Sequence, residues 1–147
     1  MDITGRVQRL HGIMRQNRAD IYIVPTADFH QSEYVGEHFK MREFLTGFTG
    51  SAGTAVFTAD EAYLWTDGRY FIQAAKELEG TPVRLMKMGK PGVPDIEHFL
   101  RDRLPEGGVI AFDGRCVSLG DGKLYEQSAA EKGGAISCGK DLAADIW

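Results

Sequence analysis

The sequence has few of the features that mark exported or membrane-embedded proteins. Its two cysteines, Cys116 and Cys138, form no CxxC pair and have no histidine cluster beside them, which indicates small buried thiols rather than a disulfide framework or metal site. No apolar run reaches the roughly 18 residues that a membrane-spanning helix needs. The N-terminus carries charges where a signal peptide has an apolar core. These absences favour a cytoplasmic protein with no membrane partner.

Clustered basic charge is also absent. The formal net charge is -4 and the lysines and arginines are scattered, whereas binding to phosphates needs them gathered on one surface. We therefore expect no nucleic-acid partner. A hydrophobic content of 43% and a charged content of 26% are ordinary for a globular domain. A chain of 147 residues is long enough for one self-sufficient core.

Apolar periodicity predicts helices that alternate with strands. Strands are expected over residues 21–25, 54–58, 62–66, 83–88, 109–113 and 135–138. Helices are expected around 3–14 and 41–45, between 68 and 80, from the Asp95 cap to Pro105, and from 118 to roughly 132, with a short piece around 32–34. Phe71, Ala74, Ala75 and Leu78 are predicted to occupy one face of the helix between 68 and 80. The strands at 54–58 and 62–66 predict an antiparallel hairpin, so the fold class is α/β, with a mixed sheet flanked by helices.

Two segments resemble ligand-binding motifs but fit structural roles better. The three-residue spacing of glycines in Gly47–Gly53 is reminiscent of phosphate-binding loops, yet these glycines precede a strand, whereas the dinucleotide fingerprint follows a strand and opens a helix. The histidines and glutamates of His30–His38 lack the H-E-x-x-H order of zinc sites, so capping and surface roles are expected. The sequence thus predicts no catalytic and no metal-binding residue in this chain.

Several short motifs, in their order along the chain, resemble one known family. Leu45–Gly53 reads LTGFTGSAG, two apolar runs follow, and Trp65–Ala75 then reads WTDGRYFIQAA. Asp28–Tyr34 reads DFHQSEY, and further similar segments lie at Leu85–Gly89 and Asp141–Trp147. Together these segments closely resemble the N-terminal domain of aminopeptidase P, the Xaa-Pro aminopeptidase, in its three-domain form. The resemblance extends over nearly the whole chain.

The resemblance implies a fold, an activity and a set of partners. The fold is the creatinase/prolidase N-terminal domain, with ribonuclease H-like topology, over residues 1–140, and residues 141–147 begin a linker to a second domain. The family hydrolyses the bond between an N-terminal residue and proline with two divalent metals, manganese or zinc, in a C-terminal catalytic domain. This chain would be inactive alone and would contribute to substrate positioning and homodimer assembly. Its partners would be that catalytic domain, a second copy and a peptide with proline at its second position.

Arg69 is the first candidate for a substrate-binding residue. It follows the Asp67-Gly68 turn and begins a helix, where the positive end of the helix dipole disfavours a cation unless an anion is near. The anion is either an internal acid such as Asp67 or a group of a substrate or neighbouring subunit, and the sequence leaves both open. Tyr70 is a candidate contact beside it, and His30 is one through the family resemblance.

Exposed aromatic residues would accompany an interface at this region. The candidates are Phe29, Tyr34, Phe39, Phe48 and Tyr70. Most of them are expected to be core residues, because aromatic side chains are usually buried. Two other functions remain open. One is a free-standing dimerisation or peptide-binding module without enzymatic activity. The other, an independent hydrolase or nucleotide-binding enzyme, is suggested only by the glycines and by acids such as Asp60, Asp67 and Asp113.

Overall fold

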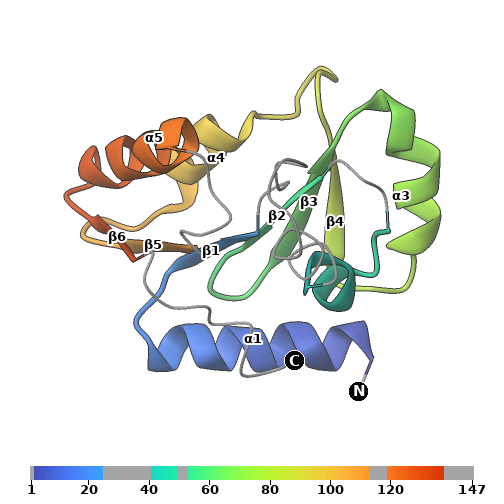
Figure 1. Cartoon of the computed structure of the whole chain (residues 1–147), viewed down its shortest axis with the longest axis horizontal. Helices are drawn as coiled ribbons and strands as arrows, with labels where there is room; N and C mark the ends of the chain where they lie inside the picture. Colours follow the sequence, from blue (N-terminus) through green and yellow to red (C-terminus); the bar gives the residue numbers. More distant parts are fainter. Residues whose placement is uncertain (1, 25–40, 50–52, 113–118, 138–147) are drawn as a thin grey trace.

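The computed structural model describes residues 2–24, 41–49, 53–112 and 119–137, and its elements follow the predicted order (Figure 1). They are α1 (Ile3–Gln16), β1 (Ile21–Val24), β2 (Thr54–Phe57), β3 (Ala62–Thr66), the 3-10 helix η1 (Gly68–Tyr70), α3 (Phe71–Glu77), β4 (Val83–Lys87), α4 (Ile96–Arg103), β5 (Val109–Phe112), α5 (Leu119–Ala130) and β6 (Ala135–Ser137). Residues 41–46 form a further helical segment. The helical piece expected around 32–34 lies outside the described residues.

The strands form one six-stranded sheet in the order β4-β3-β2-β1-β5-β6. β2 runs antiparallel to both of its neighbours, and the remaining pairs are parallel. In the predicted hairpin, Thr54 lies opposite Trp65 and Phe57 opposite Ala62. A mixed sheet with one reversed strand and flanking helices confirms the predicted α/β fold class.

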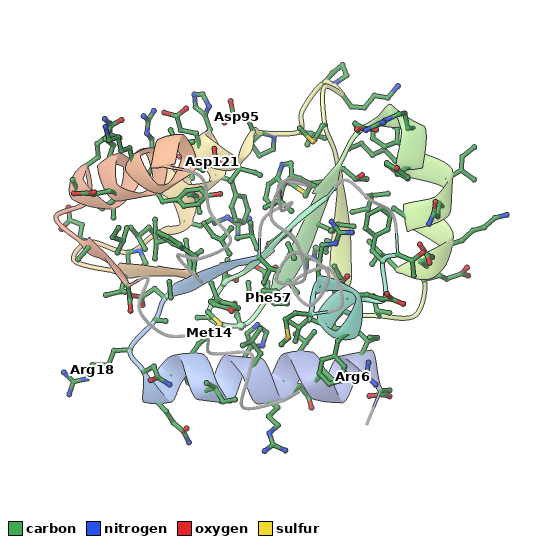
Figure 2. All side chains as sticks on the ribbon, in the orientation of Figure 1. Arg6, Met14, Arg18, Phe57, Asp95 and Asp121 are labelled. Atoms are coloured by element: carbon green, nitrogen blue, oxygen red, sulfur yellow. The ribbon has the colours of Figure 1, made fainter. Side chains whose placement is uncertain are left out.

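Helices cover both faces of the sheet and enclose two hydrophobic cores (Figure 1). α1, the 41–46 segment and α3 lie on one face, and α4 and α5 lie on the other. In β1, Tyr22 faces the first core and Ile23 the second, and both side chains are buried. Met14 and Phe57 point into the space between α1 and the sheet, whereas Arg18 points to solvent (Figure 2). A strand buried on both faces reads as a continuous apolar run, which explains the sequence IYIV.

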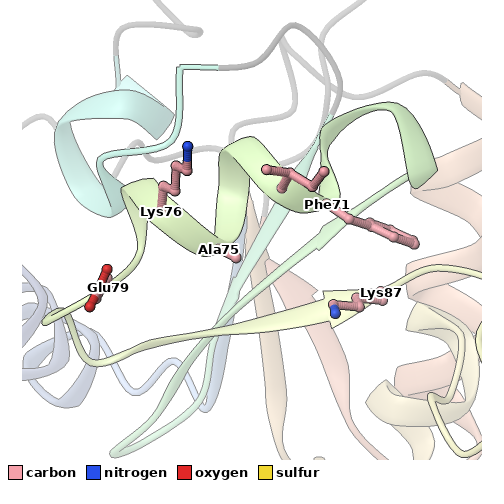
Figure 3. Close-up of a pocket in the computed structure, with 6 residues that line it drawn as sticks. Phe71, Ala75, Lys76, Glu79 and Lys87 are labelled. Atoms are coloured by element: carbon pink, nitrogen blue, oxygen red, sulfur yellow. The ribbon is translucent and has the colours of Figure 1, made fainter.

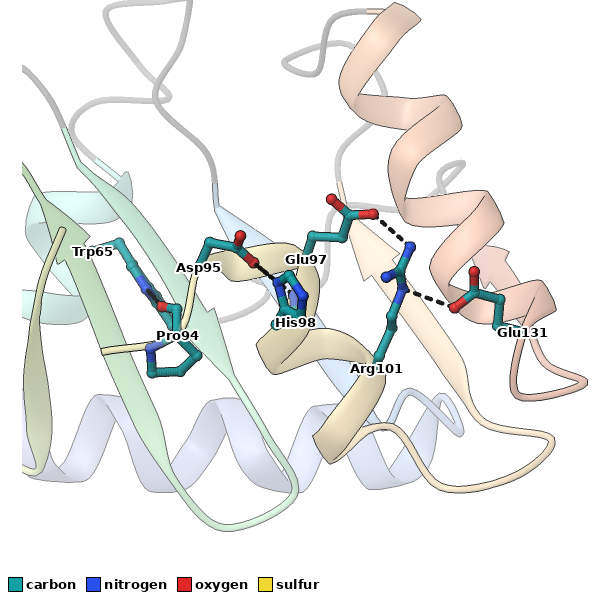
Figure 4. Close-up of polar contacts among 7 residues, drawn as sticks. All are labelled: Trp65, Pro94, Asp95, Glu97, His98, Arg101 and Glu131. Atoms are coloured by element: carbon teal, nitrogen blue, oxygen red, sulfur yellow. Dashed lines mark hydrogen bonds and ion pairs between the residues drawn. The ribbon is translucent and has the colours of Figure 1, made fainter. Parts of the chain in front are cut away.

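Aromatic rings fix α4 against the sheet. The ring centroid of Phe99 lies 4.8 Å from that of Tyr63 and 4.9 Å from that of Trp65, and both pairs have edge-to-face geometry. The Trp65 indole N–H donates a 2.9 Å hydrogen bond to the carbonyl oxygen of Pro94 (Figure 4). Because this polar group is satisfied, the large Trp65 side chain can be fully buried.

Polar contacts secure the ends of α4. Asp95 caps the helix by accepting a 2.8 Å hydrogen bond from the His98 amide, as predicted. At the other end, Arg101 binds Glu97 one turn earlier at 2.5 Å and Glu131 beyond α5 at 2.7 Å (Figure 4). Arg101 therefore ties α4 to the end of α5.

The apolar face of α3 is buried only in part. Ala74 and Leu78 are buried, but Phe71 is only half-buried and Ala75 is exposed. α3 lies at the edge of the sheet beside β4 (Figure 1), so a narrow stripe of the helix meets the core. Helical periodicity identifies the apolar side of a helix but not how far the sheet extends beneath it.

Among the described residues, no helix is long and apolar enough to cross a membrane.

Candidate functional site

The candidate site lies where β3 passes into α3, at residues 67–70. Among the described strands only β2 is reversed, so the C-terminal ends of β1, β3, β4, β5 and β6 lie at the same end of the sheet, next to residues 67–70. In open α/β sheets, ligands bind beyond the carboxyl ends of the strands. A side chain at this end of the sheet can therefore meet a ligand without disturbing the core.

Asp67 holds Arg69 in a fixed orientation. Its carboxylate caps η1 by accepting the Arg69 backbone N–H at 3.0 Å. The same carboxylate accepts Nε of Arg69 at 3.1 Å and Nη2 at 2.8 Å, a two-point contact. Of the two alternatives that the sequence leaves open, the internal acid Asp67 is in contact with Arg69 in this structure. With Arg69 71% exposed and Asp67 39% exposed, the ion pair adds little stability, and its main effect is to orient the guanidinium.

The pair is ionised at neutral pH. The hydrogen bond from the Arg69 side chain holds the pKa of Asp67 below its usual value, and the same contact raises the pKa of Arg69. Asp67 engages Nε and one Nη2 donor, and a guanidinium carries five N–H donors. Because the side chain is largely exposed, the outer donors face solvent. Arg69 can therefore bind a carbonyl or carboxylate group while Asp67 keeps it in place.

Tyr70 lies beneath this guanidinium. The Cζ atom of Arg69 is 5.3 Å from the Tyr70 ring centroid, and the Tyr70 ring contacts Phe48 edge-to-face at 5.9 Å. Tyr70 is half-buried and Phe48 is fully buried, so Phe48 is a core residue, as expected for most of these aromatic side chains. The structure brings Arg69 and Tyr70 together. His30, along with Phe29, Tyr34 and Phe39, lies outside the described residues.

A polar network that the sequence did not reveal ties the glycine-rich segment to α3. Glu77 accepts hydrogen bonds from the Thr49 hydroxyl at 2.8 Å and from the Thr49 amide at 3.2 Å. Gln73 donates to Thr49 Oγ1 and to Glu77 Oε1, each at 3.0 Å. The four-residue spacing of Gln73 and Glu77 indicates that their side chains are neighbours on one helix. Their partner Thr49 is far away in sequence, so periodicity could not identify it.

The glycines of this segment have structural roles. Gly47 has a positive φ of 82°, a conformation that favours glycine. At Gly53, a Cβ atom would lie 3.0 Å from the Phe48 ring. The structural interpretation is thus confirmed for Gly47 and Gly53, and Gly50 lies outside the described residues.

Arg42 is a buried cation that sequence reasoning missed. Its side chain is 2% exposed and donates from Nη1 to the Gly53 carbonyl oxygen at 2.8 Å. Burial lowers the pKa of Arg42 to about 10, so the group is still charged at neutral pH. The Cζ atom also lies 5.2 Å from the Phe48 ring centroid. Arg42 thereby fixes the point where the chain enters β2.

Within the described ranges, no group of three or more His, Cys, Asp or Glu side chains is arranged to hold a metal ion. The acidic and histidine residues of 30–38, Asp113, Cys116 and Cys138 lie outside these ranges. The expectations about those residues therefore stay untested by the structure.

Together, the six-stranded mixed sheet, its single reversed strand and the Asp67-Gly68-Arg69 turn define a creatinase/prolidase-type α/β domain. The sequence profile of the Creatinase/Prolidase N-terminal domain family matches residues 6–142. The chain belongs to this family.

Relatives in sequence confirm the resemblance to aminopeptidase P. The "Probable Xaa-Pro aminopeptidase P" of Arthroderma otae is 38% identical over 100% of this chain, which is 24% of that protein. "Aminopeptidase P2" of Arabidopsis thaliana is 51% identical over 77% of this chain, which is 16% of that protein. The chain thus spans about a quarter or less of the length of these curated relatives.

Solved structures agree on the fold. The X-prolyl aminopeptidase of Caenorhabditis elegans, described as a cytosolic enzyme with a di-nuclear active site, matches with a TM-score of 0.87 and 30% identity. That match covers 100% of this chain and 26% of the enzyme. The N-terminal domain of the cytoplasmic peptidase PepQ from Mycobacterium tuberculosis matches with a TM-score of 0.67 and 21% identity, covering 98% of this chain and 99% of that one. At 21% identity, this match shows similarity of the fold alone.

Proposed function

We propose that this chain is the non-catalytic N-terminal domain of a cytoplasmic Xaa-Pro aminopeptidase. The observation that carries the proposal is that aminopeptidases P match along the entire chain, while the chain spans only about a quarter of their length. Residues 1–140 would form the domain, and residues 141–147 would begin the linker to the next. The C-terminal catalytic domain of the same protein would hold two divalent metals, manganese or zinc, which activate water for peptide hydrolysis.

The contribution of this domain would be substrate positioning and assembly of a homodimer. Arg69 would direct its outer N–H donors to a carbonyl or carboxylate of a peptide with proline at the second position. Asp67 fixes the orientation of the guanidinium and the Tyr70 ring supports it, so little side-chain freedom is lost on binding. His30 would be a further substrate contact, as the family resemblance implies.

Kinetics of the whole parent enzyme test the role of Arg69. In the Arg69→Ala variant we expect KM for an Xaa-Pro peptide to rise about tenfold with kcat nearly unchanged, because a binding contact is lost and the chemistry is not touched. The matched control is Arg9→Ala, an exposed arginine on the solvent side of α1. An unchanged KM in Arg69→Ala would remove the substrate role and leave the Asp67 contact as a purely local one.

A second measurement tests the absence of catalysis. The purified 147-residue chain should release no N-terminal residue from an Xaa-Pro peptide in the presence of manganese, whereas the parent enzyme should do so under the same conditions. Metal-dependent turnover by the chain alone would contradict the proposed function.

A further inference from the structure

A groove lies on the outer side of α3, between this helix and the edge strand β4 (Figure 3). Its volume is about 360 Å³. Apolar atoms of Phe71, Ile72 and Ala75 form one wall, and Lys76, Glu79 and Lys87 complete the lining. Ile72 is 77% exposed, and together with Phe71 and Ala75 it gives the groove an apolar lining open to solvent. Contiguous exposed apolar surface marks an interaction site.

Positive charge surrounds this apolar wall. The Nζ atoms of Lys87 and Lys90 lie 5.8 Å and 6.0 Å from the Phe71 ring centroid. Lys76 adds a third ammonium group, and Glu79 is the acidic residue of the lining. The groove is therefore locally cationic on a protein whose net charge is -4. A ligand that complements it carries an apolar group flanked by acidic groups.

The backbone beside the groove can also bind a ligand. β4 ends the strand order, and β3 is its partner among the strands that the structure describes. An edge strand can pair with an extended segment of another chain through main-chain hydrogen bonds. In an extended segment, side chains two positions apart share a face. One apolar side chain of such a segment can thus enter the groove while its neighbours at two positions on either side reach the groove rim.

We propose that the α3–β4 groove binds an extended segment of a partner protein, which pairs with β4 and inserts one apolar side chain against Phe71, Ile72 and Ala75. Acidic side chains two positions before and after that residue contact Lys76, Lys87 and Lys90. The groove lining adjoins residues 67–70 through Phe71 but includes neither Arg69 nor Tyr70, so the inference goes beyond the proposed function and does not depend on it.

Charge argues for this ligand over two others. A symmetric dimer through the groove would place the same lysines of two copies against one another, which is repulsive. Anionic membranes are bound by clusters of about four to eight basic residues, and here three lysines stand on an acidic protein. Acidic protein segments need fewer cations because the β4 backbone supplies part of the binding energy.

A synthetic peptide can stand in for the unknown partner. The probe is the acetylated seven-residue peptide TETLTET, in which leucine has a glutamate two positions away on each side. Amide chemical shifts of the isotopically labelled 147-residue chain are followed by NMR during titration. We expect saturable shifts confined to α3, β4 and the turn that follows β4. A peptide with lysine in place of both glutamates should bind at least about tenfold more weakly.

Variants locate the binding surface. Ile72→Glu and Lys87→Glu should each weaken binding of TETLTET about tenfold or more, whereas Ile72→Val should retain it. The matched control is Lys123→Glu, an exposed lysine of α5, the helix that packs against β5 and β6 at the other end of the strand order, and it should change nothing. Unfolding curves of each variant verify that the fold is retained, and both affected side chains are exposed.

Several results would overturn the proposal. One is equal binding of the glutamate and lysine peptides. Another is a set of chemical-shift changes centred outside α3 and β4. A third is the absence of shift changes at a peptide concentration of about 5 mM, which exceeds the dissociation constant of most weak complexes. Dimerisation of the chain that Ile72→Glu abolishes would assign the groove to a second copy. Binding to phosphatidylserine vesicles that Lys87→Glu abolishes would assign it to a membrane surface.

Discussion

Gly47 and Gly12 occupy backbones with opposite requirements. Gly47 has a φ of 82°, in the left-handed region where a Cβ atom costs about 1–2 kcal/mol. Gly12 lies inside α1, and a Cβ built there would meet only the Arg15 side chain at 3.8 Å. In a helix interior, alanine is more stable than glycine by about 0.5–1 kcal/mol. The same substitution should therefore have opposite effects at the two positions.

We expect Gly47→Ala to lower the free energy of unfolding of the 147-residue chain by about 1–2 kcal/mol, and Gly12→Ala to raise it by about 0.5–1 kcal/mol. Urea denaturation at pH 7 measures both. The two variants control for each other because each adds one methyl group. A stabilising effect of alanine at position 47 would show that the left-handed backbone there is not required.

Single residues also show how much of the site the sequence could reveal. Asp67 and Arg69 are two residues apart, so their contact was among the predicted alternatives. Nothing in the sequence distinguishes Arg42 from the other arginines, and yet it is buried and donates a hydrogen bond to the Gly53 carbonyl oxygen. Burial depends on what packs around a side chain after folding, and a lone arginine in a sequence carries no sign of it.

Among the elements, α4 has a cap whose effect depends on pH. The backbone hydrogen bond from His98 holds the pKa of the Asp95 carboxyl group below its usual value. A carboxyl group whose pKa is lowered by folding stabilises the protein when it is ionised. Its contribution is complete above the unfolded pKa and is lost as the pH falls through the lower, folded pKa. The cap should thus be effective at neutral pH and weak in strong acid.

Asp95→Ala should lower the free energy of unfolding by about 1 kcal/mol at pH 7, a typical value for an N-cap. This difference from the wild type should shrink as the pH is lowered from about 4 to 2, because the wild-type carboxyl group becomes protonated. Urea denaturation across this range measures it. Asp102→Ala, which removes an exposed carboxyl group of the same helix, is the control and should have little effect at any pH. A difference for Asp95→Ala that stays constant down to pH 2 would argue against a role of the ionised cap.

The elements themselves were largely predictable, for a physical reason. Strands such as β1 and the β2–β3 hairpin are short apolar runs bounded by turn-forming residues, and that pattern survives in any tertiary context. The exposed side of α3 was not predictable, because Ala75 and Ile72 look like core residues in a helical pattern. Their exposure follows from the position of α3 at the edge of the sheet, which is a property of the assembled fold.

On the scale of the whole molecule, the order of the strands brings distant segments together. β1 pairs with β5, so that Tyr22 lies beside Ala111. Periodicity alone could not identify this pairing, because any two apolar strands satisfy the same pattern. The family resemblance implied the type of fold without naming this pairing. The motifs that carried that resemblance, above all WTDGRYFIQAA, combine a strand, a turn and a helix start in a fixed order.

Hydrogen exchange should show that stability decreases from the centre of the sheet outward. β1 has a strand on each side and is buried on both faces, whereas β4 and β6 lie at the two edges and include exposed residues. We expect the amides of β1 and of the adjacent β2 to exchange most slowly, because they are released only by global unfolding. Exchange measured by NMR at neutral pH tests this, and equal protection of β4 and β1 would contradict it.

The covering of the second core by α4 and α5 has a consequence during synthesis on the ribosome. Ile23, Tyr63 and Trp65 are made early, but α4 and α5, which bury them, begin only at residues 96 and 119. While those later codons are being translated, the nascent polypeptide displays a broad apolar surface. Chaperones bind surfaces of this type. Slow translation between residues 96 and 119 would therefore prolong the time during which the nascent polypeptide can aggregate.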